Sequence, residues 1–208
     1  MYQHITKKMI LSLIFVAILL VLVVSVSYAA YTYEETSSTS NTINAGTITM
    51  KYTEPSSGID LGDALPVDDA TAKAWTESGK VFSFSVAVTS TGTITVPYEI
   101  SIQKTEATLE DSQVKIYLTK GTLGSETAIY GPSLMSTLMV SSNKSTLRTS
   151  VTAYKIHTET INFVNGSASN ATVNYHLRIW VDSAATVTSG LNYKLLVHVD
   201  SVVKPIGQ

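Results

Sequence analysis

Apolar and polar side chains alternate along most of the chain after residue 42, and this alternation predicts β-strands. The clearest case is the segment 81–89, in which Phe82, Phe84, Val86 and Val88 share one face and small polar residues mostly take the other. The same pattern predicts strands at 43–52, 94–102, 114–118, 152–163, 173–181 and 191–199, and more weakly at 134–140. One-sided alternation is typical of antiparallel sheets that pack one face on a core and expose the other.

Turn-forming residues separate these segments, and one short helix interrupts them. Asp68 or Asp69 can cap a helix at 70–78, and Gly79 lies just past its end. Seven or eight strands joined by short turns predict an all-β fold, an antiparallel jelly-roll or β-sandwich spanning residues 43–208. The apolar faces of the strands predict a core that includes Phe82, Phe84, Val86, Ile100, Leu177, Ile179, Leu195 and Val197.

The N-terminal segment predicts export. Residues 9–26 are apolar and uncharged, with Lys7 and Lys8 just before them and acidic residues after, so the N-terminus is expected to face the cytoplasm. The segment is longer than the usual signal-peptide core of about 7–15 residues and approaches the length that spans a bilayer. Ala29 and Ala30 nevertheless lie where a signal peptidase cuts. Residues 1–29 are therefore a signal peptide or a membrane anchor, and the rest of the chain is expected outside the cytoplasm, secreted or at the cell surface.

Composition reduces the number of function classes that need to be considered. The formal net charge is −2 and only 14% of the residues are charged, which disfavours a nucleic-acid partner because such proteins present a basic face. The chain has no cysteine, which excludes thiol catalysis, cysteine-zinc sites and iron–sulfur clusters.

Two clusters could hold a metal ion. His157 and Glu159 share a strand face and, with His176 or His198, could form a zinc set. The acidic residues Asp60, Asp63, Asp68 and Asp69 could hold calcium. Neither cluster has the spacing of a known metal motif, so solvent-facing histidines and a solvated loop with a helix cap are the favoured interpretation. We expect no metal, no cofactor and, without a G-x-S-x-G elbow, no enzyme activity.

Three glycosylation sequons begin at Asn143, Asn165 and Asn170, a pattern that also arises by chance in a chain rich in Ser and Thr. Trp180 falls on the polar face of its strand beside Arg178. It is either an exposed contact residue or buried against a second layer.

Three stretches together resemble the TasA/camelysin family of exported bacterial matrix proteins. They are Ser27-Tyr28-Ala29-Ala30-Tyr31 at the end of the export segment, the 41–50 stretch around Ala45-Gly46-Thr47, and the run formed by 59–61, 65–69 and 82–84. The resemblance implies a jelly-roll domain that assembles into extracellular fibres, in which an N-terminal strand of one subunit completes the sheet of the next. Some camelysin-type proteins have been described as proteases, but no residue pattern here matches a protease site.

The sequence therefore predicts an exported structural protein, a fibre or biofilm-matrix subunit whose partner is another copy of itself. Residues 30–42 are a linker or a donor strand, and Tyr31, Tyr33 and Ile43 are the apolar residues expected to drive self-assembly. The alternative is a membrane-anchored ectodomain, held by residues 9–26, that binds a surface ligand as a monomer.

The orientation can be tested directly. A reporter enzyme that is active only outside the cytoplasm, fused after Gln208, is expected to be active because Lys7 and Lys8 keep the N-terminus inside. A second reporter, active only in the cytoplasm, serves as the control. Activity of that second fusion would overturn the orientation.

Overall fold

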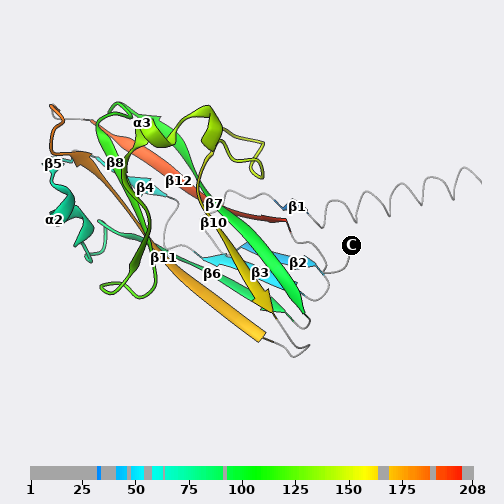
Figure 1. Cartoon of the computed structure of the whole chain (residues 1–208). Helices are drawn as coiled ribbons and strands as arrows, with labels where there is room; N and C mark the ends of the chain where they lie inside the picture. The colour runs from blue at the N-terminus through cyan, green and yellow to red at the C-terminus, as the bar shows by residue number, and fades with distance from the viewer. Residues whose placement is uncertain are drawn as a thin grey trace, which may run out of the picture.

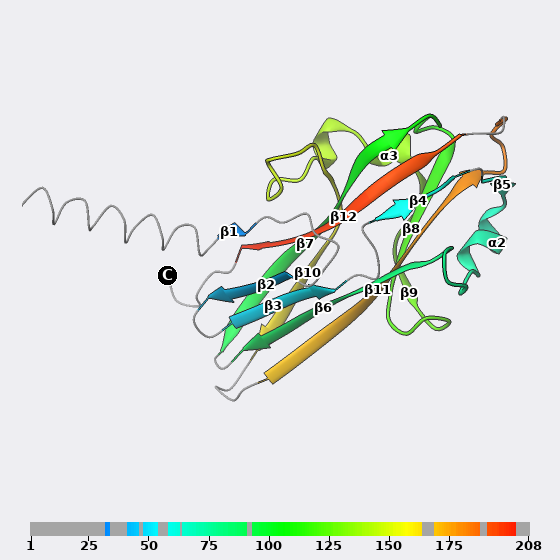
Figure 2. The same cartoon turned by 180° about the vertical axis from the view of Figure 1, so that it is seen from behind.

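Two β-sheets face each other in a sandwich (Figures 1 and 2). The structure, a computed structural model, describes residues 32–33, 41–45, 48–53, 58–62, 64–90, 93–163, 169–187 and 191–202. The export segment, with the expected cleavage site at Ala29 and Ala30, lies outside these ranges, as does Tyr31. Within them, no helix is long and apolar enough to cross a bilayer.

The smaller sheet has five strands and the larger has seven. The smaller sheet runs in spatial order through β1 (Thr32–Tyr33), β12 (Tyr193–Val202), β7 (Ile94–Ala107) and β10 (Tyr154–Phe163), and β4 (Ile59–Asp60) also pairs with β12. The larger sheet runs through β2 (Asn41–Ala45), β3 (Ile48–Thr53), β6 (Phe82–Ser90), β11 (Ser169–Asp182), β8 (Val114–Lys120) and β9 (Thr127–Leu134), and β5 (Pro66–Val67) pairs with β11.

The order of the strands is that of a jelly roll. From β6 onward the chain passes between the sheets, so that β6-β11-β8-β9 forms one layer and β12-β7-β10 the other. All pairs are antiparallel except β5 with β11. The predicted all-β antiparallel sandwich is therefore confirmed. The β2–β3 hairpin extends the larger sheet beyond β6.

Three local predictions were wrong. The segment 43–52 forms two strands, β2 and β3, that pair with each other and place Ile43 opposite Met50, because its apolar residues change parity across residues 46–47. The helix α2 (Asp69–Lys73) is shorter than expected, although Asp68 caps it by accepting a 2.9 Å hydrogen bond from the Thr71 N–H. The segment 134–140 forms a helix, α3 (Met135–Leu138), followed by the 3₁₀ helix η1 (Ser141–Asn143). Met135 and Leu138 are both buried, and a spacing of three suits one helical turn.

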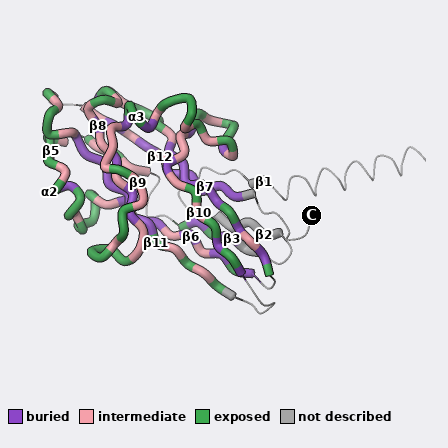
Figure 3. Tube along the Cα trace, in the orientation of Figure 1, coloured by how far each residue is buried: buried purple, intermediate pink, exposed green. Residues whose placement is uncertain are grey.

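The core lies between the sheets, where buried positions follow each strand (Figure 3). All eight residues predicted for the core are buried. Phe84 stacks on Tyr175 with ring centroids 5.2 Å apart and meets Tyr52 edge-on at 5.6 Å.

The hydroxyls of Tyr98 and Tyr175 share a buried 2.6 Å hydrogen bond that joins the two sheets, and burial raises the pKa of Tyr98 to about 12. Trp180 is 1% exposed, so the buried interpretation of this residue is the correct one.

Replacing Phe84 with Ala should remove about 3–5 kcal/mol from the free energy of unfolding, because the substitution removes a buried ring and leaves a cavity in the core. Urea unfolding followed by far-UV circular dichroism measures the change. The matched control is Leu123→Ala, whose side chain is 37% exposed and which should shift stability by less than about 0.5 kcal/mol. Equal effects of the two substitutions would contradict the described core.

Candidate functional site

The outer edge of β12 is the most unusual feature of the smaller sheet. On one side β12 pairs with β7 from Tyr193 to Ser201. On the other side it pairs with β4 at Lys194–Leu195 and with β1 at Ser201–Val202. Between these two short contacts, the described part of the chain supplies no strand to pair with β12. Figure 2 shows β1 and β4 beside different parts of β12.

In this part of β12, main-chain N–H and C=O groups face away from β7. The N–H and C=O of Tyr193 exchange hydrogen bonds of 3.2 and 3.0 Å with Leu61, so the main chain of Tyr193 faces the β4 side. Because neighbouring residues of an antiparallel strand turn their main-chain groups to opposite sides, Val197 and Val199 also present theirs outward. Their side chains are buried in the core. In a jelly roll this position belongs to the first strand, of which the described residues form only the two ends.

The residues predicted for self-assembly fall in different places. Tyr33 lies in β1, opposite Ser201 at the edge of the smaller sheet. Ile43 lies in β2, at the edge of the larger sheet. The structure therefore does not bring Tyr33 and Ile43 onto one strand, and each pairs within its own chain.

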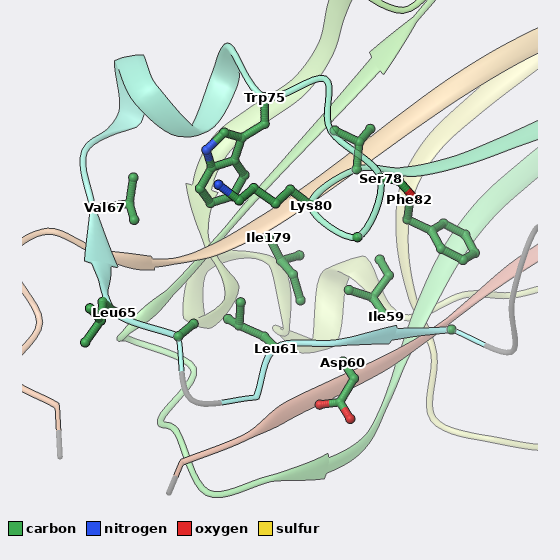
Figure 4. Close-up of a pocket in the computed structure, with 14 residues that line it drawn as sticks. Ile59, Asp60, Leu61, Leu65, Val67, Trp75, Ser78, Lys80, Phe82 and Ile179 are labelled. Atoms are coloured by element: carbon green, nitrogen blue, oxygen red, sulfur yellow. The ribbon is translucent and has the colours of Figure 1, made fainter. Parts of the chain in front are cut away.

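A pocket of about 630 Å³ opens at the β4 end of the sandwich, beside α2 (Figure 4). Its walls are mainly apolar. They come from β4 and the residues next to it, from β5 and the residues before it, from the segment between α2 and β6, and from the start of β6 and one residue of β11. The lining residues are Gly58, Ile59, Asp60, Leu61, Ala64, Leu65, Val67, Trp75, Ser78, Gly79, Lys80, Val81, Phe82 and Ile179.

A buried arginine holds one wall of this pocket. Arg178 is 1% exposed and donates two hydrogen bonds, of 3.0 and 2.7 Å, to the carbonyl oxygen of Trp75. It also donates to Thr119 Oγ1 at 3.2 Å and to Glu126 Oε1 at 2.6 Å. Burial raises the pKa of Glu126, but the hydrogen bond and charge of Arg178 outweigh it, so the carboxyl pKa lies below its ordinary value. The guanidinium thereby fixes the segment that follows α2.

The acidic residues of the predicted calcium cluster make separate contacts. Asp68 caps α2, and that cap lowers its carboxyl pKa. Asp69 bonds to Lys115 at 2.9 Å, Asp60 lies 3.7 Å from Lys194, and Asp63 lies outside the described residues. The part of the chain that the structure describes contains no group of three or more histidine or acidic side chains able to hold a metal ion.

The histidines considered for zinc are also separated. His157 and Glu159 do share a face, with 3.6 Å between Nε2 and Oε2, and Glu159 pairs with Lys120. His176 lies in the other sheet, where it bonds to Ser83 at 2.8 Å and to the Gly121 carbonyl at 3.0 Å. His198 bonds to Gln103 at 3.0 Å. His176 and His198 are buried and both rings form local hydrogen bonds, so the expectation of solvent-facing histidines was wrong for these two.

Of the sequon asparagines, Asn143 lies in η1 and donates a 2.9 Å hydrogen bond to the Leu138 carbonyl. Asn170 is exposed in β11, opposite Thr89, and Asn165 lies outside the described residues.

Sequence reasoning missed Trp75, Lys80 and the pair formed by Arg178 and Glu126. A signal for Arg178 exists, because an arginine flanked by Leu177 and Ile179 in a central strand needs a buried partner. The partner itself, in the segment before β9, carries no comparable pattern.

No family model and no curated protein matches the chain. Among solved structures, the carbohydrate-binding module TmCBM61, in complex with β-1,4-galactotriose, is similar at 8% sequence identity, covering 72% of this chain and 86% of the module, with a TM-score of 0.19.

Replacing Glu126 with Gln should lower the free energy of unfolding at pH 7 by about 1.5–3 kcal/mol, because it weakens a hydrogen bond to a buried charge. The folded-state pKa of Glu126 is depressed, so its contribution is present above the ordinary pKa of 4.5 and lost as the pH falls through the lower, folded value. The difference from wild type in urea unfolding should therefore shrink below pH 4.5.

The matched control is Glu106→Gln. Glu106 pairs with Lys194 at 3.1 Å, but its side chain is 57% exposed and solvent screens the pair, so a smaller loss of stability than for Glu126→Gln is expected. An effect of Glu126→Gln no larger than that of the control would contradict the role of Arg178 as a buried anchor.

Proposed function

We propose that this chain is an exported structural protein, a subunit of an extracellular fibre or matrix that assembles by β-strand donation. The observation that carries the proposal is the edge of β12, where the described residues supply only the two ends of the first strand of the jelly roll. An edge with outward main-chain N–H and C=O groups is a template for pairing with another chain.

The donated strand would come from the N-terminal segment of another subunit. In the single chain β1 is two residues long, and its pairing with β12 is small enough to be exchanged for the same pairing between subunits. β1 runs antiparallel to β12, with Thr32 opposite Val202 and Tyr33 opposite Ser201. A donor that entered in this register and continued along β12 would reach the outward main-chain groups of Val199 and then Val197.

The residues of the N-terminal segment suit strand addition. Main-chain hydrogen bonds supply affinity, and alternate side chains set the register. Tyr31 and Tyr33 share a parity, so both can point to the same side of a donated strand. Residues 34–40 are polar, so they would not need a deep apolar groove in the accepting subunit.

The alternative, a membrane-anchored ectodomain that binds a surface ligand as a monomer, is favoured by the pocket beside α2. The two functions differ in the fate of residues 9–26. A mature chain that begins near Ala30 leaves the donor segment free, whereas a chain that keeps residues 9–26 is tethered.

Deleting residues 30–40 while keeping an efficient signal should abolish oligomers of the secreted protein and leave a folded monomer. Light scattering after size-exclusion chromatography and negative-stain images measure the loss, and far-UV circular dichroism checks the fold. A synthetic peptide of residues 30–44 should inhibit assembly of the full-length protein, whereas a scrambled peptide of the same composition should not. Unchanged oligomers after deletion, or a wild type that stays monomeric at high concentration, would rule out strand donation.

A further inference from the structure

The pocket beside α2 combines an apolar interior with a single cation at its mouth. Ile179 and Phe82, at its floor, belong to the sandwich core and are 4% and 7% exposed. Among its described lining residues, only Asp60 and Lys80 carry charge. A volume of about 630 Å³ falls in the range of small-molecule sites.

The two charged groups are placed differently. The carboxylate of Asp60 points away from the pocket and lies 3.7 Å from the ammonium of Lys194 (Figure 4). The ammonium of Lys80 lies over the indole of Trp75, 5.1 Å from the ring centroid, and no carboxylate in the described parts of the chain forms an ion pair with it. The electrostatic character of the mouth is therefore set by one cation beside an aromatic wall.

We propose that this pocket binds an amphipathic anion, a carboxylate carried on an apolar chain. The apolar walls formed by Ile59, Leu61 and Ile179 would take the chain, and Lys80 would pair with the carboxylate at the mouth. A sugar is a poor fit, because the lining offers few polar side chains to satisfy its hydroxyls and Lys80 lies across the indole face on which a sugar ring would stack. A cationic head group is disfavoured by Lys80 itself.

The walls are fixed before any ligand arrives. Arg178 holds the main chain of Trp75, and β4 is held by its pairing with β12. Little ordering of the protein is needed on binding, so most of the free energy gained by burying the apolar chain contributes to affinity. The site belongs to the single chain, and this inference does not depend on fibre assembly.

The two tryptophans make the site easy to follow. Trp75 lines the pocket, whereas Trp180 is 1% exposed and does not. Titrating the full chain with decanoate, below its micellar concentration, should give a saturable change in tryptophan fluorescence. The change should be absent in Trp75→Phe, with binding then retained by calorimetry. Affinity should rise about fourfold for each methylene added from octanoate to decanoate, as burial of a methylene requires.

Charge variants distinguish a site that recognises the carboxylate from one that binds any apolar chain. Lys80→Gln should weaken decanoate binding about three- to fivefold and leave decanol binding unchanged, since an exposed ion pair is lost while the apolar walls remain. Lys73→Gln, an exposed lysine at the end of α2 that does not line the pocket, is the matched control and should change neither. No saturable binding of decanoate, equal affinity for decanoate and decanol, or equal effects of the two lysine variants would each overturn the proposal.

Discussion

Main-chain hydrogen bonding along β12 is the constraint on which the rest of the smaller sheet depends. Every strand needs a partner for its N–H and C=O groups, and β12 is the only described strand that joins β7 to the first-strand position of the jelly roll. β7 pairs with one side of it from Tyr193 to Ser201. On the other side, the described residues supply two strands of two residues each, β1 and β4. The length of β12 between them, where the described residues supply no partner strand, connects the fold of this domain to the assembly that we propose for it.

β4 couples the edge of β12 to the pocket. Gly58 leads into β4 with φ at +135°, and a Cβ on this residue would lie 2.4 Å from the carbonyl oxygen of Leu195. Only glycine permits that approach, which brings β4 against β12 and so places Ile59 and Leu61 in the pocket wall. On the opposite wall, Arg178 ties the main chain of Trp75 to Glu126. The two sites therefore share a short strand that approaches β12 closely through its backbone and packs Ile59 and Leu61 against the core.

The sequence predicts what depends on alternation and misses what depends on contacts between distant segments. The core residues from Phe82 to Val197 follow from the parity of their strands, because an antiparallel sandwich buries every second side chain. β9 was missed because Gly131 and Pro132 interrupt any alternation in it, and α3 was taken for a weak strand because four residues show no period. The pocket could not be predicted, since Trp75 meets Arg178 across about a hundred residues of chain. The acidic loop was visible in the sequence, but its partners Lys115 and Lys194 were not.

The place of β12 in the chain has a consequence for the export that we propose. β12 is the last of the described strands in sequence, yet it lies between β7 and the short strands β1 and β4, so the smaller sheet cannot close until residues 193–202 are available. While the C-terminal strand is still being synthesised, the rest of the domain lacks the partner for a whole side of β7. In the export that we propose, the chain would cross the membrane unfolded, and this topology would delay closure of the smaller sheet until residues 193–202 have been made. The same strand that presents the proposed assembly edge would thus keep the polypeptide unfolded during its passage.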